Sequence, residues 1–183
     1  MADTDRLDGP ENFAEFTALV EARGIEEFGP GVLEPLLVGL LLRRAARLTM
    51  VDIDQESLRP ADLTWTEYRV CFSLWVVGPQ EPHRVAVLGS MSRAAVSAAR
   101  KKLVDGGYIT ATASESDQRS IVLALTPEGT ERITRMYGQH LKITAEWLEP
   151  LSIPERQVLM GLLGKIMASP RASTFGPGRI VNS

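Results

Sequence analysis

Apolar residues recur at intervals of three and four along much of the chain, a spacing typical of helices that bury one face. In the first such stretch, Phe16 and Val20 share a face, Asn12 is suited to cap the start, and Gly24 is expected to end the helix. A longer helix is predicted over 34–52. Its apolar residues cover more than one side, which favours burial at a subunit interface.

Between Thr64 and Leu125 the pattern changes from long helices to shorter elements. Thr64 and Glu67 have the spacing of a capping box, in which two residues at a helix start satisfy each other's backbone amides. Alternating apolar residues that end at Leu125 indicate a returning strand. The expected elements are a polar connection over 52–62, a helix from Thr64 to Gly78, a short helix over 84–88, a turn at Gly89, a helix from Ser90 or Ser92 to Asp105, and a hairpin of strands 108–113 and 121–125 with a polar tip at 114–118.

Two further helices are expected after the hairpin. The helix over 126–147 starts with a threonine N-cap and a proline at the first position. The helix over 152–168 starts with a second capping box, formed by Ser152 and Glu155. The tail over 169–183 has no periodicity and is expected to be poorly ordered.

The order helix, short helix, glycine turn, helix and hairpin is the plan of a winged helix-turn-helix. The second helix of such a motif fits a DNA major groove, and the hairpin reaches the neighbouring minor groove or backbone. The fold class expected is therefore mainly α with a small β-hairpin, in which a winged helix-turn-helix carries N- and C-terminal dimerisation helices. The expected segments are an N-terminal extension with a short helix (1–31), a dimerisation helix with its connection (32–62), the DNA-binding lobe (63–126), the C-terminal dimerisation helices (127–168) and the tail (169–183).

The formal net charge of −3 argues at first against a nucleic-acid partner, but the charge is unevenly distributed. Residues 1–34 carry nine acids against two bases, whereas residues 84–120 carry six bases against three acids. A basic segment within an acidic chain can neutralise phosphates if the fold gathers it on one surface.

On the predicted recognition helix, polar and small residues lie opposite the apolar face of Val96, Ala99 and Leu103. Arg93, near the N-terminal end, is a candidate for a guanine edge, whereas the later basic residues Arg100, Lys101 and Lys102 suit phosphates. Small alanines let the helix approach DNA closely. The candidate DNA-binding residues on this segment are Ser90, Ser92, Arg93, Ala94, Ser97, Arg100 and Lys101.

Residues 88–97 and 102–109 resemble the recognition helix and strand entry of the MarR (multiple antibiotic resistance regulator) family. Asp117 and Arg119 match that family's wing signature, and residues 125–129 match the start of its following helix. The resemblance covers about residues 33–168. It implies that Arg119 contacts the minor groove while Asp117 orients it, and that the protein is a homodimeric regulator, more often a repressor, on double-stranded DNA.

The same resemblance implies a small aromatic or anionic effector bound between the dimerisation helices and the DNA-binding lobe. The candidate effector residues are Arg43, Arg47, Trp65, Tyr68 and Trp75. For each of them the alternative is ordinary core packing or a salt bridge. The additional N-terminal helix resembles that of the urate- and phenolic-responsive branch.

Several other classes of function receive no support from the sequence. No phosphate-binding glycine loop or nucleophile–base arrangement indicates an enzyme, so no catalytic residue is expected. No close His and acid grouping indicates a metal, no cofactor is implied, and the single cysteine, Cys71, is expected to be a buried structural thiol. The lack of a signal-peptide or membrane-spanning pattern favours a cytoplasmic location and no membrane partner. The alternative function is a winged-helix protein-interaction module without specific DNA binding, which the acidic N-terminal segment supports.

Overall fold

The computed structural model describes residues 12–113 and 120–174. The chain divides into two compact units, residues 1–50 and residues 51–183. The boundary falls inside the long helix α2 (Leu33–Ile53), so the last turn of α2 belongs to the second unit.

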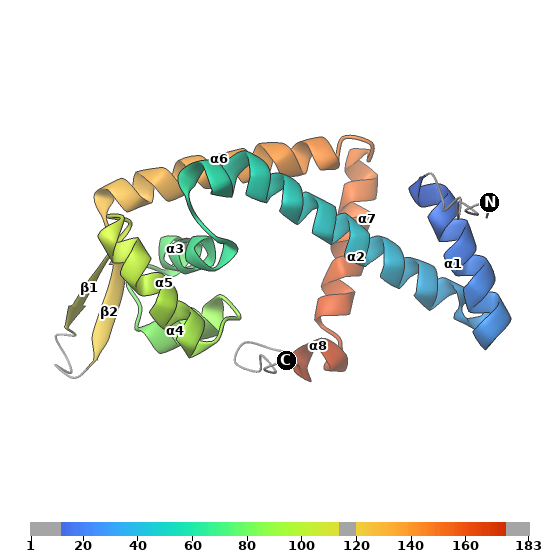
Figure 1. Cartoon of the computed structure of the whole chain (residues 1–183), viewed down its shortest axis with the longest axis horizontal. Helices are drawn as coiled ribbons and strands as arrows, with labels where there is room; N and C mark the ends of the chain where they lie inside the picture. Colours follow the sequence, from blue (N-terminus) through green and yellow to red (C-terminus); the bar gives the residue numbers. More distant parts are fainter. Residues whose placement is uncertain (1–11, 114–119, 175–183) are drawn as a thin grey trace, which may run out of the picture. The chain divides into compact units, whose positions relative to one another are not determined.

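The N-terminal unit consists of helix α1 (Phe13–Phe28), a 3-10 turn η1 (Pro30–Val32) and most of α2 (Figure 1). The side chain of Asn12 caps α1 as predicted, accepting from the amide of Glu15 at 3.0 Å. The prediction that Gly24 ends the helix is wrong, because α1 continues to Phe28. Gly24 is buried instead, and a Cβ there would lie 2.5 Å from Cδ1 of Leu36. The glycine therefore serves the close approach of α1 to α2 and does not break the helix.

The second unit contains the predicted winged helix-turn-helix, in the predicted order (Figure 1). Strand β1 pairs with β2 in an antiparallel register that runs from Ile109 opposite Leu125 to Ala113 opposite Ile121. One core holds the elements together, and its fully buried members include Val70, Val85, Val96, Leu103 and Leu123. The elements are α3 (Trp65–Val77), α4 (Pro82–Leu88), α5 (Arg93–Asp105), β1 (Ile109–Ala113) and β2 (Ile121–Leu125).

The connection over 52–62 is more regular than its composition suggested. The chain stays helical beyond α2 as a π-helical turn, η2 (Asp54–Leu58), and a 3-10 turn, η3 (Arg59–Ala61). Leu58 is fully buried in the core, which holds the segment against the lobe despite its polar neighbours. The helical path ends at Asp62, whose φ of 52° is left-handed.

After the hairpin the chain forms α6 (Pro127–Trp147), α7 (Ile153–Met167) and α8 (Pro170–Thr174). The side chain of Thr126 caps α6, and Ser152 with Glu155 forms the second capping box. The expectation of a poorly ordered tail is wrong for 170–174, which are helical, whereas 175–183 lie outside the described residues. Within the described ranges, no helix is both long and apolar enough to cross a bilayer.

Gly129 provides a test of how tightly α6 is seated on the lobe. A Cβ at this position would overlap the carbonyl oxygen of Tyr108 and lie 2.8 Å from its carbonyl carbon. Because both atoms are backbone, we expect Gly129→Ala to lower the free energy of unfolding by about 2 kcal/mol, measured by chemical denaturation. Gly138 is the matched control, since it lies in the same helix and a Cβ added there would meet nothing within 4 Å.

We expect Gly138→Ala to raise stability by about 0.5–1 kcal/mol, because alanine loses less backbone entropy than glycine in a helix. Equal changes in the free energy of unfolding for the two substitutions would contradict close packing of Gly129 against the backbone of Tyr108.

Candidate nucleic-acid interface

The candidate recognition helix is α5, and its start is defined by Ser92. The Ser92 hydroxyl accepts from the amide of Ala95 at 3.0 Å, so Ser92 rather than Ser90 is the N-cap. Ser90 lies two residues earlier in the turn, with a left-handed φ of 49°. Gly106 and Gly107 end the helix as predicted, and Gly107 has a φ of 72°.

One face of α5 is buried and the other is exposed. Val96, Ala99 and Leu103 pack into the core, as their spacing predicted. On the opposite side Arg93, Ala94, Ser97 and Lys101 are exposed, and Ser92 and Arg100 are half-buried. The structure thus brings the candidate DNA-binding residues of this helix onto one accessible surface.

Lys102, unlike Lys101, is held by contacts within the protein. Its Nζ donates to the backbone carbonyl of Asp62 at 2.6 Å, and it lies 3.1 Å from the Asp62 carboxylate and 3.5 Å from that of Glu67. The hydrogen bond to Asp62 is the main reason that the pKa of Lys102 is raised. Lys102 therefore joins α5 to the start of α3, which differs from the expectation that it binds phosphate.

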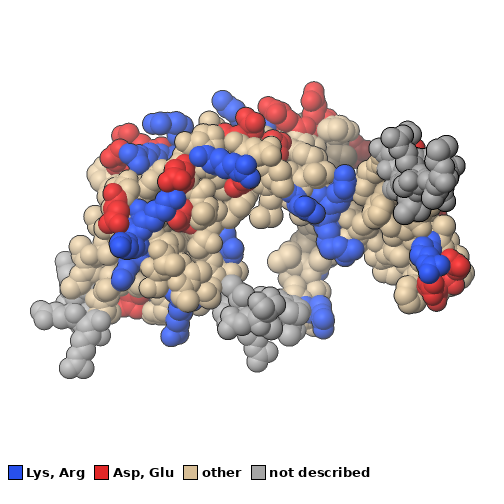
Figure 2. All heavy atoms as spheres, in the orientation of Figure 1, with Lys and Arg blue, Asp and Glu red and all other residues tan. Residues whose placement is uncertain are grey.

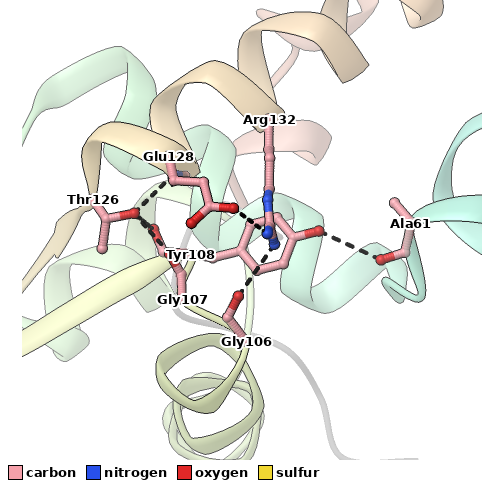
Figure 3. A network of polar contacts seen from close by, with 8 residues as sticks. Ala61, Gly106, Gly107, Tyr108, Thr126, Glu128 and Arg132 are labelled. Carbon is pink, nitrogen blue, oxygen red and sulfur yellow. Dashed lines mark hydrogen bonds and ion pairs between the residues drawn. The ribbon is translucent and has the colours of Figure 1, made fainter.

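The C-terminal end of α5 is joined to the start of α6 by polar contacts (Figure 3). Nη1 of Arg132 donates to the Gly106 carbonyl at 3.2 Å, and the guanidinium pairs with Glu128 and lies 4.8 Å from the ring centre of Tyr108. The Thr126 hydroxyl donates to the Gly107 carbonyl at 2.7 Å. Arg132 could not be identified from the sequence, because only the fold brings it to the end of α5.

The hairpin is extended by a bridge that the pattern did not reveal. The amide of Gln80 donates to the Leu123 carbonyl at 3.0 Å, and the Leu123 amide donates back at 2.9 Å. This bridge fixes the middle of β2 to the segment between α3 and α4. The two predicted wing residues, Asp117 and Arg119, lie outside the described residues, as does the predicted tip.

Basic and acidic side chains are interspersed over the lobe on the face drawn in Figure 2. On that face no large area of a single sign stands out over α5 and α6. On this face, phosphate contacts would therefore come from a few correctly placed basic side chains rather than from a broad positive field.

Trp65, Tyr68 and Trp75 are brought together in what we call the aromatic row, along α3 and α6. Tyr68 lies 5.8 Å from Trp65 and 5.7 Å from Phe72 between ring centres, and Phe72 lies 6.0 Å from Trp75. Trp75 donates from Nε1 to the Thr134 hydroxyl at 3.0 Å. The row consists of Trp65, Tyr68, Phe72, Trp75, Tyr137 and His140.

Burial sets the chemistry of this row. It raises the pKa of Tyr68 to about 12, with a smaller contribution from Tyr137, and it lowers the pKa of His140. His140 is 5% exposed, and its Nε2 has no hydrogen-bond partner among the described residues. Arg43 and Arg47, the other candidate effector residues, belong to the N-terminal unit, where both are exposed on α2.

Cys71 is fully buried, as predicted for a structural thiol. Burial, followed by the nearby charge of Glu67, raises its pKa to about 12, which suppresses the reactive thiolate. His83 lies 3.0 Å from the carboxylate of Glu81. Within 12–113 and 120–174, no group of three or more His, Cys, Asp or Glu side chains is arranged to hold a metal ion.

Comparison with known sequences agrees with this geometry. Residues 63–121 match the model of the MarR family. YwaE, an HTH-type transcriptional regulator of Bacillus subtilis, is 28% identical over 134 residues, which is 73% of this chain and 78% of YwaE.

Similar solved structures are also regulators. A probable transcriptional regulator of Pseudomonas aeruginosa is 25% identical with a TM-score of 0.62, and the match covers 70% of this chain and 96% of that one. BpsR of Bordetella bronchiseptica, whose DNA binding is regulated by 6-hydroxynicotinic acid, is 26% identical with a TM-score of 0.62, covering 71% and 98%.

A mutant of Escherichia coli MarR in complex with operator DNA shares the fold, at 22% identity and a TM-score of 0.63, covering 74% of this chain and 97% of that one. YwaE and the Pseudomonas aeruginosa protein are described as transcriptional regulators, and the shared fold confirms the predicted fold class. The winged helix-turn-helix, its sequence match and its structural neighbours together show that residues 63–121 of this chain match the MarR family of transcriptional regulators.

Proposed function

We propose that this protein is a ligand-responsive repressor that binds a pseudo-palindromic operator as a homodimer. The observation that carries the proposal is the accessible face of α5. Arg93, Arg100 and Lys101 share this face, and none of them forms an ion pair or side-chain hydrogen bond with another residue in the described part of the chain. A recognition helix needs side-chain donors that are not already bonded within the protein, because DNA offers acceptors on its phosphates and guanine edges.

The position of each basic residue along α5 suggests its role in binding DNA. Arg93 is the first residue of the helix, the end that meets base edges in helix-turn-helix proteins. Arg100 and Lys101 lie two turns later and suit phosphates. Asp117 and Arg119 retain the minor-groove role that the family resemblance implies.

A homodimer is supported by the apolar surface of α7, which has no buried residue in the single chain. Ile153 is 70% exposed and Met167 is 73% exposed. A helix so apolar is stable in water only when another surface covers it, and a second copy provides an identical helix for that purpose. The other large exposed apolar residues of α7 are Val158, Met160, Leu162, Leu163 and Ile166.

The aromatic row is the proposed effector site, with Trp65, Tyr68 and Trp75 as its candidate residues. Flat aromatic rings suit an aromatic ligand. The regulation of BpsR by 6-hydroxynicotinic acid supports this class of effector. Arg43 and Arg47, which belong to the N-terminal unit, stay effector candidates on the family resemblance alone.

Fluorescence anisotropy on the DNA upstream of the protein's own gene tests the proposal, with random DNA of equal length as the comparison. At several salt concentrations we expect the upstream DNA to bind about a thousandfold more tightly or better. Arg93→Ala should reduce that excess about tenfold, since a bidentate base contact discriminates by that order. Equal binding to both DNAs by a dimeric preparation would instead favour a protein-interaction module.

Lys101 and Lys102 are adjacent, exposed lysines, and of the two only Lys102 pairs with carboxylates in the described part of the chain. We expect Lys101→Met to reduce the slope of log affinity against log salt by about one, because one phosphate contact is lost. Lys102→Met should leave the slope unchanged, since its charge is already held by Asp62 and Glu67. A slope lowered equally in both variants would show that Asp62 and Glu67 do not keep Lys102 from contacting phosphate, and an unchanged slope in both would show that Lys101 does not contact it.

The dimer can be tested through α7. Met160 is 65% exposed in the single chain, and we expect Met160→Lys to weaken self-association at least about tenfold, because a charge would enter an apolar contact. Analytical ultracentrifugation over a concentration series measures the change. Thr112→Lys adds the same charge on exposed strand β1 and should leave the association unchanged. A Met160→Lys protein that remains fully dimeric would place the interface elsewhere.

A further inference from the structure

Arg69 contacts the turn of the helix-turn-helix from outside that turn. It lies in the middle of α3 and is half-buried. Its Nη2 donates to the backbone carbonyl of Gly89, and to that of Ser90 at 3.0 Å. One nitrogen of one guanidinium therefore holds two successive carbonyls of the turn that leads from α4 into α5.

The conformation of the turn explains why those carbonyls need a partner. The amides of the turn are satisfied locally, since Ser90 donates to Val87 at 3.1 Å and Met91 donates to Ala86 at 2.8 Å. Ser90 has a left-handed φ of 49°, which is unfavourable for a residue with a side chain. With the chain reversed in this way, the carbonyls of Gly89 and Ser90 have no place in α4 or α5, and the arginine bonds them.

We infer that Arg69 is a positioning residue for DNA recognition. By holding the Gly89 and Ser90 carbonyls it fixes the turn, and the turn determines where Ser92 and Arg93 begin the recognition helix. This inference rests on the proposed function, because it assumes that the N-terminal end of α5 contacts base edges. Arg69 acts on that end through the backbone and does not itself touch DNA.

An arginine suits this task better than a lysine. Each terminal nitrogen of a guanidinium carries two N–H groups in a fixed plane, which can serve two neighbouring acceptors together. A lysine carries the same charge on a flexible stem and fixes the direction of neither bond. Arg69→Lys therefore retains the charge while weakening the geometry, and Arg69→Met removes both but keeps an apolar stem.

The first test uses the free protein, so it does not depend on any operator. Hydrogen exchange of the Ser90 and Met91 amides should be at least about tenfold faster in Arg69→Met and intermediate in Arg69→Lys, because local opening of the turn is no longer opposed. The amides of Val70 and Leu74, within α3, should keep their protection. Arg59→Met is the control, since Arg59 belongs to the same unit but pairs with Asp54 on the surface. Unchanged exchange at Ser90 and Met91 would overturn the inference.

The second test compares the variants on operator and random DNA. We expect the ratio of specific to non-specific affinity to fall about tenfold in Arg69→Met and by less in Arg69→Lys, because the end of α5 that meets base edges is displaced. The salt slope of Arg69→Lys should equal that of the wild type. A uniform loss on all DNA, with a slope lower by about one in Arg69→Met, would make Arg69 a phosphate contact and overturn the inference.

A lower melting temperature with an unchanged specificity ratio would also overturn it, since it would leave Arg69 with a purely structural role. If Arg69→Met does not fold, Arg69→Lys supplies both measurements. If the wild-type protein shows no specific binding, the proposed function fails while the exchange experiment still decides whether Arg69 holds the turn.

Discussion

The structure of the DNA-binding lobe depends on the buried carboxylate of Glu67. Glu67 is 7% exposed, and Oε2 accepts from the Thr64 amide at 2.7 Å while lying 3.5 Å from Nζ of Lys102. A carboxylate removed from water is tolerated only when charges and donors compensate for the lost hydration. Through its bond to Thr64, Glu67 fixes the start of α3. Through its contact with Lys102, it holds α5 against α3. The same charge contributes to the raised pKa of Cys71.

Basic residues around α5 consequently fall into two groups with different tasks. Arg69 bonds carbonyls of the turn before α5, whereas Lys102 and Arg132 bond carbonyls or carboxylates of the lobe at the C-terminal end of the helix. Arg93, Arg100 and Lys101 have no such partner in the described part of the chain and point to the accessible side. The side chains of the second group are therefore available to neutralise phosphate. This division explains how a chain with a net charge of −3 can present a DNA-binding helix, since the charge that matters belongs to a few uncommitted side chains.

Local chemistry made most of the fold predictable. Thr64, Ser92 and Thr126 cap the helices that follow them, because an N-cap hydroxyl needs only the first turn of its own helix. The failures occurred where distant contacts decide. Gly24 continues a helix because Leu36 packs against it, and residues 54–61 stay helical because Leu58 enters the core. Neither partner is visible from local spacing.

The candidate interface was predictable to the same extent. Helical spacing separates the exposed face of α5 from the buried face of Val96, Ala99 and Leu103. It cannot separate Lys101 from Lys102, because both side chains are exposed. The difference between them comes from Asp62 and Glu67, which are far from α5 in the sequence and pair only with Lys102. Arg69 was missed for the same reason, since its partners lie 20 and 21 residues away in a turn.

These contacts also constrain how an effector could act. The start of α6 packs against the backbone of Tyr108 at Gly129. Arg132 and Thr126 donate hydrogen bonds to the carbonyls of the two glycines that follow α5 (Figure 3). The aromatic row joins α3 to α6 further along. The recognition helix therefore cannot turn within the lobe without breaking several of these bonds at once. In the proposed dimer, a ligand at the aromatic row would be expected to move each lobe as a rigid body with the start of α6, and so to change the spacing of the two recognition helices rather than the shape of either one.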